Sequence, residues 1–152
     1  ILPCGNGAER VLSNANVGAQ IAGLDFNRHG RAQICRAVQE GIVFSFMYGM
    51  EVMEETGIEI KTIRAGFANM FMSSVFCETL AGVSGATIEL YETDGSLGAA
   101  RGAGVGAGIY GSCEEAFRTL EKKKTVRPGA GNYADAYTMW KRHLQQVLKE
   151  EK

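Results

Sequence analysis

The sequence has little that could form a metal site or a disulfide-bonded scaffold. Its 152 residues include two histidines and four cysteines, Cys4, Cys35, Cys77 and Cys113. No pair of cysteines has metal-ligand spacing, and each cysteine stands beside apolar or small residues. We therefore expect reduced, mostly buried thiols, as in a cytosolic protein, and no metal site.

Long apolar runs and surplus positive charge are also missing. No run approaches the ~20 apolar residues of a membrane-spanning helix, and no stretch resembles a signal peptide. The formal net charge is −1, and the only basic run, Lys122-Lys123-Lys124, is predicted to be a solvated turn after a helix. Because binding to a phosphate backbone needs clustered lysine and arginine, we expect a cytoplasmic protein that binds neither membranes nor nucleic acid.

Common catalytic motifs are absent as well. The sequence contains no G-x-x-x-x-G-K-[ST] phosphate loop and no G-x-S-x-G nucleophile turn. Residues Gly106 to Gly111 match G-x-G-x-x-G, but they follow a helix-like segment rather than a strand, which disfavours a Rossmann-type dinucleotide site. The paired carboxylates Glu54-Glu55 and Glu114-Glu115 are typical of solvated helix surfaces.

The stretch from Ile60 to Tyr110 is the most informative part of the chain. It predicts a strand at Ile60–Ala65, a turn at Gly66–Asn69 and an apolar helix at Met70–Leu80. A second unit follows, with a strand at Ala86–Leu90, a turn at Glu92–Ser96 and a glycine-rich helix at Leu97–Tyr110. A small-residue turn between a strand and a helix carries free backbone N–H groups and little bulk, so it can receive a nucleotide closely.

The remaining segments predict helices around these two units. We expect an irregular Ile1–Arg28 segment, helices at Gly30–Thr56, Ser112–Leu120 and Tyr133–Lys149, and a linker at Thr125–Gly131. Alternating strands and helices favour an α/β domain. Two strands do not make a stable sheet, so either Ile1–Arg28 supplies strands or the sheet continues in an absent part of the protein. The chain starts at Ile1 without an initiator methionine, which fits a fragment or a processed chain.

Glycines inside two of the predicted helices call for a packing explanation. Gly41 and Gly49 suggest that another backbone approaches the Gly30–Thr56 helix. Five glycines in Leu97–Tyr110 cost on the order of 3–5 kcal/mol relative to alanine. We expect close packing of that helix on a sheet or on another helix to offset this cost.

Five segments together resemble the FGGY carbohydrate kinases. Arg36–Phe44 resembles the "RA…EG.AF" helix of that family, and Ala65–Asn69 occupies the place of its Gly-Gly-x-Ala adenosine turn. The other three segments are Leu2-Pro3 with Asn6–Arg10 (family "LP…NGER"), Asp94–Ala100 (family "E.GALGAA") and the closing helix from Tyr133. They fall in family order and span almost the whole chain.

This resemblance implies the fold and the activity of the longer protein. The implied fold is the ribonuclease-H-like, actin-like ATPase C-terminal domain, in part, with helices packed on a small mixed sheet. Residues 1–152 would be the later part of that second domain, and the N-terminal sugar-binding domain is absent. The parent would be a xylulokinase-like kinase that uses ATP with Mg2+ to phosphorylate a ketose, with D-xylulose as the first candidate. The oligomeric state is not determined, which leaves a homodimer open.

The resemblance also implies a nucleotide site, residue by residue. Gly66, Phe67 and Ala68 would line the adenosine, Asn69 would lie near the adenine, and Asp94, Gly95 and Ser96 would be more distant neighbours. Phe67 and Ala65 replace two of the family's glycines, and the Phe67 ring could stack on the base or block it. The catalytic aspartate and the phosphate-binding turns are expected upstream of this chain, so the chain alone should not phosphorylate a sugar. The alternative is a non-catalytic actin-like module that binds a nucleotide or another protein.

Overall fold

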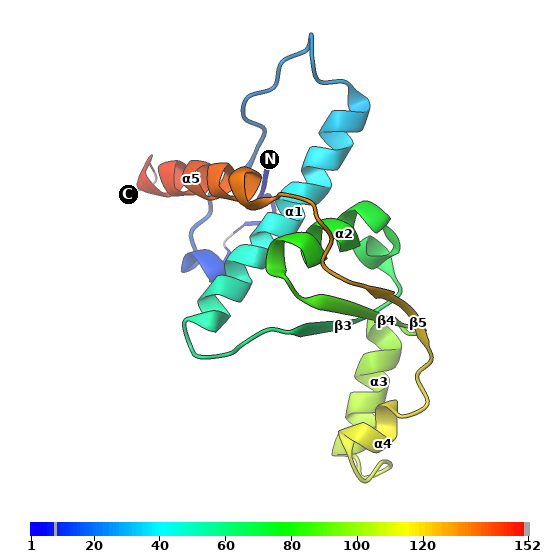
Figure 1. The fold of residues 1–152 in the computed structure, drawn as a ribbon. Coiled ribbons are helices and arrows are strands. Elements are labelled where there is room, and N and C mark those ends of the chain that lie inside the picture. The colour runs from blue at the N-terminus through cyan, green and yellow to red at the C-terminus, as the bar shows by residue number, and fades with distance from the viewer. Residues whose placement is uncertain (8, 151–152) are drawn as a thin grey trace.

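A three-stranded sheet flanked by helices forms the centre of the computed structural model, which describes residues 1–7 and 9–150 (Figure 1). The Asn6–Arg10 segment of the family resemblance contains Ala8, which lies outside the described residues. The helices and strands are, in chain order, β1 Leu2–Pro3, η1 (3-10) Arg10–Leu12, β2 Ala19–Gln20, α1 Arg31–Glu54, β3 Thr62–Gly66, η2 (3-10) Asn69–Met72, α2 Ser74–Ser84, β4 Thr87–Tyr91, α3 Gly95–Gly106, α4 Cys113–Phe117, β5 Lys122–Val126 and α5 Ala134–Glu150.

The sheet is mixed, as predicted, and has the order β3-β4-β5. Strand β3 runs parallel to β4, with Ile63 opposite Ile88, and β5 runs antiparallel to β4. The buried side chains Ile88, Leu90 and Val126 alternate with exposed or half-buried residues, because neighbouring side chains of a strand point to opposite faces. One face of the sheet is therefore apolar and the other is polar.

The third strand corrects the sequence prediction. Lys122–Lys124 was predicted to be a solvated turn and Thr125–Gly131 a linker, whereas Lys122–Val126 forms β5. Only Val126 of this strand is buried, so the sequence carries almost no apolar signal for it. Lysines are common on the edge strands of sheets, where they discourage pairing with other chains. Residues 1–28 do supply two strands, but β1 and β2 form a separate antiparallel pair.

The core lies between the apolar face of the sheet and the helices. Helix α2 packs on the sheet and against α1, and α5 crosses α1 on the far side (Figure 1). Phe76 of α2 is completely buried, with its ring 5.3 Å from that of Phe71 and 5.9 Å from that of Phe46. On the other side of α1, Trp140 donates a hydrogen bond from Nε1 to the Ile1 carbonyl oxygen at 2.8 Å. The chain start is thereby fixed to the last helix.

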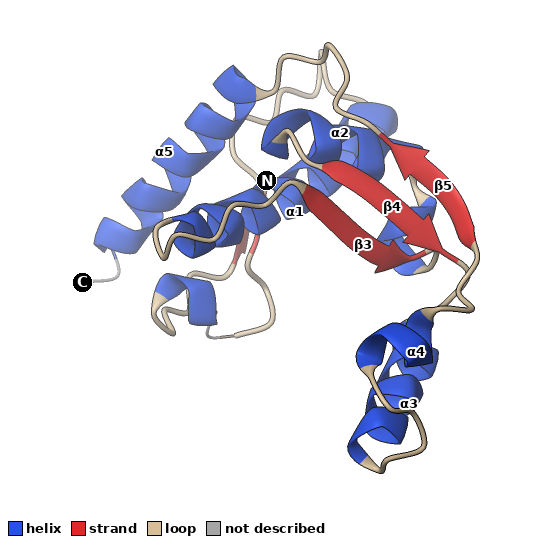
Figure 2. Ribbon diagram, turned by 60° about the horizontal axis from the view of Figure 1, so that its bottom comes forward, coloured by secondary structure: helices blue, strands red, loops and turns tan. Residues whose placement is uncertain are grey.

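The glycines of the two helices behave differently. A β-carbon at Gly41 would lie 2.3 Å from the Ile1 carbonyl oxygen, so the predicted close backbone approach is confirmed there. The glycine-rich helix does pack on another helix, since α3 and α4 form a pair that projects from the end of the sheet (Figure 2). The close approach expected at its glycines is not found at three of them, because no atom lies within 4 Å of a β-carbon built at Gly98, Gly102 or Gly106. Only Gly104 meets a close neighbour, the Tyr110 ring.

Two of the four cysteines are buried. All four are free, with Cys4 and Cys77 buried and Cys35 and Cys113 exposed, so the prediction of mostly buried thiols holds for only two of them. Burial raises the pKa of both the Cys4 and the Cys77 thiol. Within the part of the chain that the structure describes, no helix has the length and apolar character needed to cross a bilayer.

Candidate functional site

The two predicted nucleotide-binding segments meet at one edge of the sheet. Parallel strands place their carboxyl ends at the same edge, and β3 ends at Gly66 while β4 ends at Tyr91. The Phe67 N–H donates to the Tyr91 carbonyl oxygen at 2.8 Å, which ties the first turn to the end of β4. Ligands of open α/β sheets commonly bind at this edge. The structure thus brings the Gly66–Asn69 turn beside the Asp94–Ser96 segment.

Gly66 allows the two turns to approach each other. A β-carbon on Gly66 would lie 2.3 Å from the Thr93 carbonyl oxygen and 3.3 Å from Asp94 Cα. Both neighbours are backbone atoms, so no side-chain rotation could relieve the collision. Gly66 therefore has a structural reason to be glycine, and its contact with a nucleotide stays a prediction.

The rest of the first turn presents polar and aromatic groups at the surface. The Phe67 side chain is 37% exposed, Ala68 is half-buried and Asn69 is exposed. Asn69 has φ +51°, in the left-handed region, which asparagine tolerates better than most residues. The turn is fixed by its backbone hydrogen bonds, including one from Ala68 N–H to the Gly66 carbonyl oxygen at 2.8 Å. The hydrogen-bonded turn therefore holds the Phe67 ring and the Asn69 amide at the surface.

The second segment begins helix α3. Asp94 is its N-cap, and its Oδ1 accepts hydrogen bonds from the Leu97 N–H at 2.9 Å and from the Ser96 hydroxyl at 2.7 Å. These donors, the Leu97 N–H first, lower the pKa of the Asp94 carboxyl group. Gly95 and Ser96 are the first two residues of the helix. Asp94 therefore anchors α3 beside the turn and leaves Gly95 exposed at the edge.

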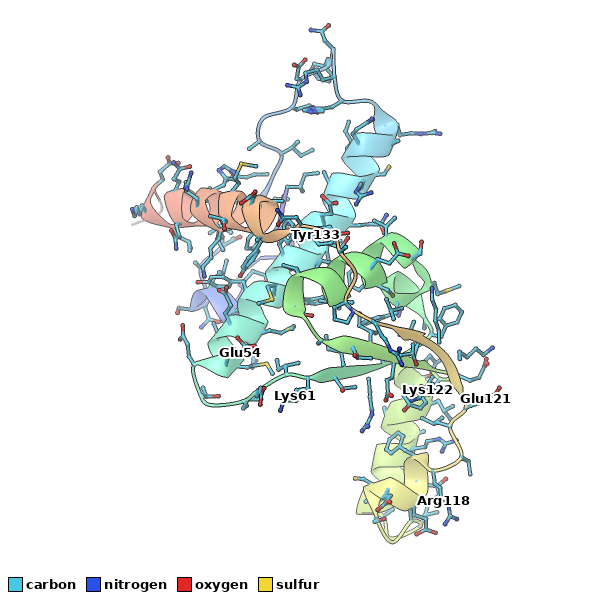
Figure 3. All side chains as sticks on the ribbon, in the orientation of Figure 1. Glu54, Lys61, Arg118, Glu121, Lys122 and Tyr133 are labelled. Atoms are coloured by element: carbon cyan, nitrogen blue, oxygen red, sulfur yellow. The ribbon has the colours of Figure 1, made fainter. Side chains whose placement is uncertain are left out.

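A charged cluster on the polar face of the sheet lies next to these turns, and the sequence alone did not reveal it. The Glu89 carboxylate accepts hydrogen bonds from Arg64 Nε at 3.0 Å, from the Tyr91 hydroxyl at 3.0 Å and from Lys122. Lys122 is the first residue of β5 and is labelled in Figure 3. The hydrogen bond from Lys122 and then that from Arg64 lower the pKa of Glu89 to about 2. The cluster could be predicted only if β5 and its register on β4 were known. The lysine-rich sequence of β5 does not indicate a strand.

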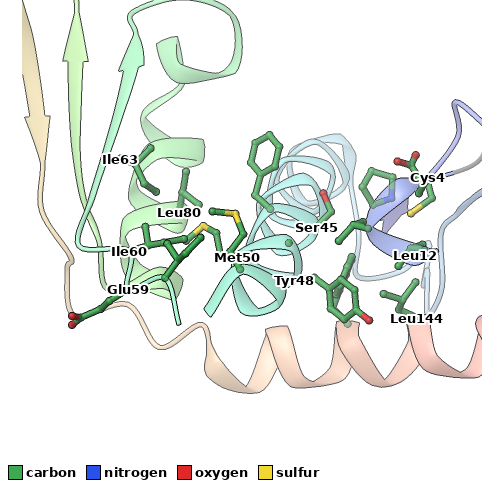
Figure 4. A pocket seen from close by; sticks show the side chains of 18 of the residues that line it. Cys4, Leu12, Ser45, Tyr48, Met50, Glu59, Ile60, Ile63, Leu80 and Leu144 are labelled. Carbon is green, nitrogen blue, oxygen red and sulfur yellow. The ribbon is translucent and has the colours of Figure 1, made fainter. Parts of the chain in front are cut away.

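A large cavity lies elsewhere. It has a volume of about 1000 Å3 and is lined by Ile60, Ile63, Met50 and Leu80 among others, at the start of β3 (Figure 4). Within the described residues, neither this cavity nor a smaller one beside Tyr137 is lined by the two turns. The candidate site is therefore an edge of the sheet that lies outside these two cavities. In the described ranges, no three histidine, cysteine or acidic side chains are grouped so that they could hold a metal ion.

Comparison with known proteins finds similarity to sugar kinases. No family model matches the sequence. The chain is 30% identical over 155 residues to the xylulose kinase of Haemophilus influenzae. This match covers 97% of this chain and 31% of that protein. It is 42% identical over 96 residues to the L-xylulose/3-keto-L-gulonate kinase of Escherichia coli, covering 60% of this chain and 19% of that protein. The chain thus spans about a third or less of the curated relatives that it matches.

The fold is similar to that of solved kinase structures. The crystal structure of Plasmodium falciparum glycerol kinase with ADP matches 97% of this chain and 30% of that chain, with a TM-score of 0.73 and 21% sequence identity. At this identity the likeness shows the fold. The predicted α/β, actin-like ATPase fold with helices on a small mixed sheet is confirmed.

Proposed function

Since this chain belongs to the FGGY family of carbohydrate kinases, we propose that it is the later part of the second domain of a ketose kinase. The full-length protein transfers the γ-phosphate of ATP to a ketose hydroxyl, and D-xylulose is the first candidate substrate. The observation that carries this proposal is the similarity to a xylulose kinase over 97% of the chain. The sugar-binding domain and the residue that accepts the hydroxyl proton belong to other parts of the protein.

In this proposal, the edge formed by the two turns positions the adenosine end of ATP. Gly66–Asn69 line the nucleoside, the exposed Phe67 ring stacks on the adenine, and the Asn69 amide hydrogen-bonds to the edge of the base. Asp94 and Ser96 hold the start of α3 beside that edge. Positioning of this kind is the main protein contribution to phosphoryl transfer, together with charge stabilisation at the phosphates.

Mg2+ would neutralise charge on the ATP phosphates, as in phosphoryl transfer generally. Within the described residues, the acidic side chains near the turns are already engaged, because Asp94 caps α3 and Glu89 pairs with Arg64 and Lys122. We therefore assign the metal to the ATP phosphates and to side chains outside this chain. This chain alone is not expected to phosphorylate a sugar.

An Asn69 substitution tests the assignment of the adenine edge. We expect Asn69→Gly in the full-length protein to raise the KM for ATP by about 5- to 10-fold, since it removes one hydrogen bond to the base. The KM for the ketose should change less than 2-fold. Glycine is preferred to alanine here because it keeps the left-handed backbone of Asn69 without strain. Steady-state kinetics with each substrate varied in turn gives both constants.

The matched control is Asn132→Gly, an exposed asparagine before α5, far along the chain from the two turns. It should leave both KM values unchanged. The assignment of Asn69 is wrong if Asn69→Gly raises the ketose KM more than the ATP KM.

One observation favours a second candidate, a non-catalytic actin-like module. The bulky Phe67 side chain stands at a glycine position of the family's adenosine turn, and it could cover the base site. Calorimetry of the full-length protein separates a kinase, which binds ATP and not NAD, from a protein-binding module, which binds neither nucleotide. A nucleotide-binding module without catalysis binds ATP but forms no ADP when a ketose is supplied.

A further inference from the structure

One backbone carbonyl group joins the two turns of the candidate site. The Tyr91 carbonyl oxygen, at the end of β4, accepts hydrogen bonds from the Phe67 N–H and from the Thr93 N–H, both at 2.8 Å. Phe67 belongs to the first turn, and Thr93 is the residue whose carbonyl oxygen lies against Gly66. The position of the Tyr91 peptide group therefore fixes the spacing between the Gly66–Asn69 turn and the start of α3.

The pairing with β5 is irregular at Tyr91. Leu90 lies opposite Lys124 and Tyr91 lies opposite Lys122, so β5 has one extra residue, Lys123, at this point. An extra residue of this kind, a β-bulge, disrupts the ladder locally and redirects neighbouring side chains. The ladder alone therefore fixes Tyr91 less firmly than the residues before it.

The Tyr91 side chain is held by Glu89, two residues earlier on the same face of β4. The Tyr91 hydroxyl donates to Glu89 Oε2 at 3.0 Å, and Lys122 Nζ lies 5.8 Å from the centre of the Tyr91 ring. The Glu89 side chain is 18% exposed and also accepts hydrogen bonds from Arg64 of β3 and from Lys122 of β5. One carboxylate thus connects side chains of all three strands on the polar face of the sheet.

This cluster differs from an ordinary surface ion pair in its position. The Arg64 and Lys122 side chains are 73% and 43% exposed, and such pairs contribute little to the free energy of folding because water and salt screen them. The Glu89 carboxylate, however, lies one hydrogen bond away from the residue that joins the two turns. It does so at the sheet edge where ligands of α/β domains commonly bind.

We propose that Glu89 is a positioning residue for the nucleotide. Its hydrogen bond fixes the Tyr91 side chain, and through it the Tyr91 carbonyl group that holds both turns at the spacing required by the adenosine. Glu89 acts through Tyr91 rather than by contact with ATP, whose phosphates a carboxylate would repel. This inference rests on the proposed function, in which the two turns bind the adenosine end of ATP.

Kinetics of the full-length protein test the proposal. We expect Glu89→Ala and Tyr91→Phe each to raise the KM for ATP about 3- to 5-fold, because each variant removes the bond between the carboxylate and the hydroxyl. The KM for the ketose should change less than about 2-fold. Since the two residues act through one bond, the double variant should raise the ATP KM no further than the larger single effect.

Two further variants separate the hydrogen bond from the charge. Glu89→Gln should keep the ATP KM within about 2-fold of the unmodified protein, because the glutamine carbonyl oxygen still accepts from the Tyr91 hydroxyl. The matched control is Glu51→Ala, which removes a carboxylate of similar exposure, 27%, that pairs with Lys141. Glu51 lies on α1, which contributes to neither turn, so both KM values should stay unchanged.

Three kinetic results would overturn the positioning role of Glu89. An ATP KM unchanged in Glu89→Ala, or raised by the same factor as the ketose KM, shows no specific effect on the nucleotide. Single effects that multiply in the double variant show that Glu89 and Tyr91 act independently. An ATP KM raised as much by Glu89→Gln as by Glu89→Ala shows that the charge matters and the bond to Tyr91 does not.

Hydrogen exchange of the full-length protein gives a readout that does not depend on activity. In Glu89→Ala, the Phe67 and Thr93 amides should exchange at least about threefold faster, since both bond to the Tyr91 carbonyl oxygen. The amide of Leu80, which is buried in α2, should keep its rate. Unchanged exchange at Phe67 and Thr93 also overturns the proposal.

The outcome is separable from that of the proposed function. Faster exchange at Phe67 and Thr93 in a full-length protein that phosphorylates no ketose contradicts the function alone. Turnover of a ketose with unchanged exchange at these two amides contradicts the positioning role alone.

Discussion

Gly66→Ala is expected to destabilise this chain by about 3 kcal/mol and to weaken ATP binding by the full-length protein at least tenfold. The new β-carbon would lie 2.3 Å from the Thr93 carbonyl oxygen and 3.0 Å from its carbon, so the backbones of the two turns must separate. Overpacking against side chains costs about 1–3 kcal/mol, and a collision between backbones falls at the upper end of that range. Urea unfolding followed by circular dichroism measures the first effect, and calorimetry with ATP measures the second.

The matched control is Gly98→Ala in α3, where no atom lies within 4 Å of the new β-carbon. Alanine should stabilise that helix by about 0.5–1 kcal/mol. The contact between the two turns is contradicted if Gly66→Ala unfolds within 0.5 kcal/mol of the unmodified chain. This threshold is about the spread of neutral surface substitutions.

Phe76→Ala is expected to produce the largest loss of stability, about 3–5 kcal/mol. The Phe76 side chain is 0% exposed and packs edge-on against Phe46 and Phe71. Truncation therefore removes buried apolar surface and leaves a cavity between α1 and α2. Because a typical domain is stable by only 5–15 kcal/mol, the variant should unfold at a markedly lower urea concentration.

Phe26→Ala is the control for Phe76→Ala, since the Phe26 side chain is 86% exposed. Its free energy of unfolding should stay within about 0.5 kcal/mol of the unmodified chain. If the two variants unfold at the same urea concentration, α2 does not hold the core as described. Because α2 follows the Gly66–Asn69 turn, Phe76→Ala should also weaken ATP binding by the full-length protein.

The sequence predicted the parts of the fold that carry a periodic apolar signal. The predicted strands Ile60–Ala65 and Ala86–Leu90 agree with β3 and β4 to within two residues, because more buried and less buried residues alternate along both strands up to Ala65 and Tyr91. Strand β5 was missed because Lys122–Thr125 are exposed and only Val126 is buried. The segment therefore shows no alternation of buried and exposed residues. A lysine-rich edge strand and a lysine-rich turn have the same local sequence pattern, and only pairing with β4 distinguishes them.

The candidate site was predicted from the small residues of its turns together with the family resemblance. The resemblance indicated the Gly66–Asn69 turn and the Asp94–Ser96 segment as neighbours, and the structure brings Gly66 against Thr93 and Asp94. The backbone contact itself could not be predicted, because it depends on the register of β3 and β4, 25 residues apart at Arg64 and Glu89. The cavity at the start of β3 was not predicted either, because its lining includes side chains from segments distant in sequence, such as Leu12, Leu80 and Leu144.

The glycines of α3 show a limit of reasoning from propensity alone. Gly98, Gly102 and Gly106 lower helix stability whether or not another element packs on them, so their presence did not reveal the environment. In the structure these positions are open, and α3 is held by α4 through Arg101, which donates to the Ala116 carbonyl oxygen and to Thr119 Oγ1.

Phosphorylation assays on the full-length protein test the central claim most directly. ATP, Mg2+ and a panel of pentuloses, hexuloses and polyols are supplied, and ADP formation is measured. The proposal predicts ADP formation that requires a ketose, fastest with D-xylulose, and a raised ATP KM when Asn69 is replaced by glycine. Absence of turnover with every ketose and polyol, from a folded full-length protein, would contradict it.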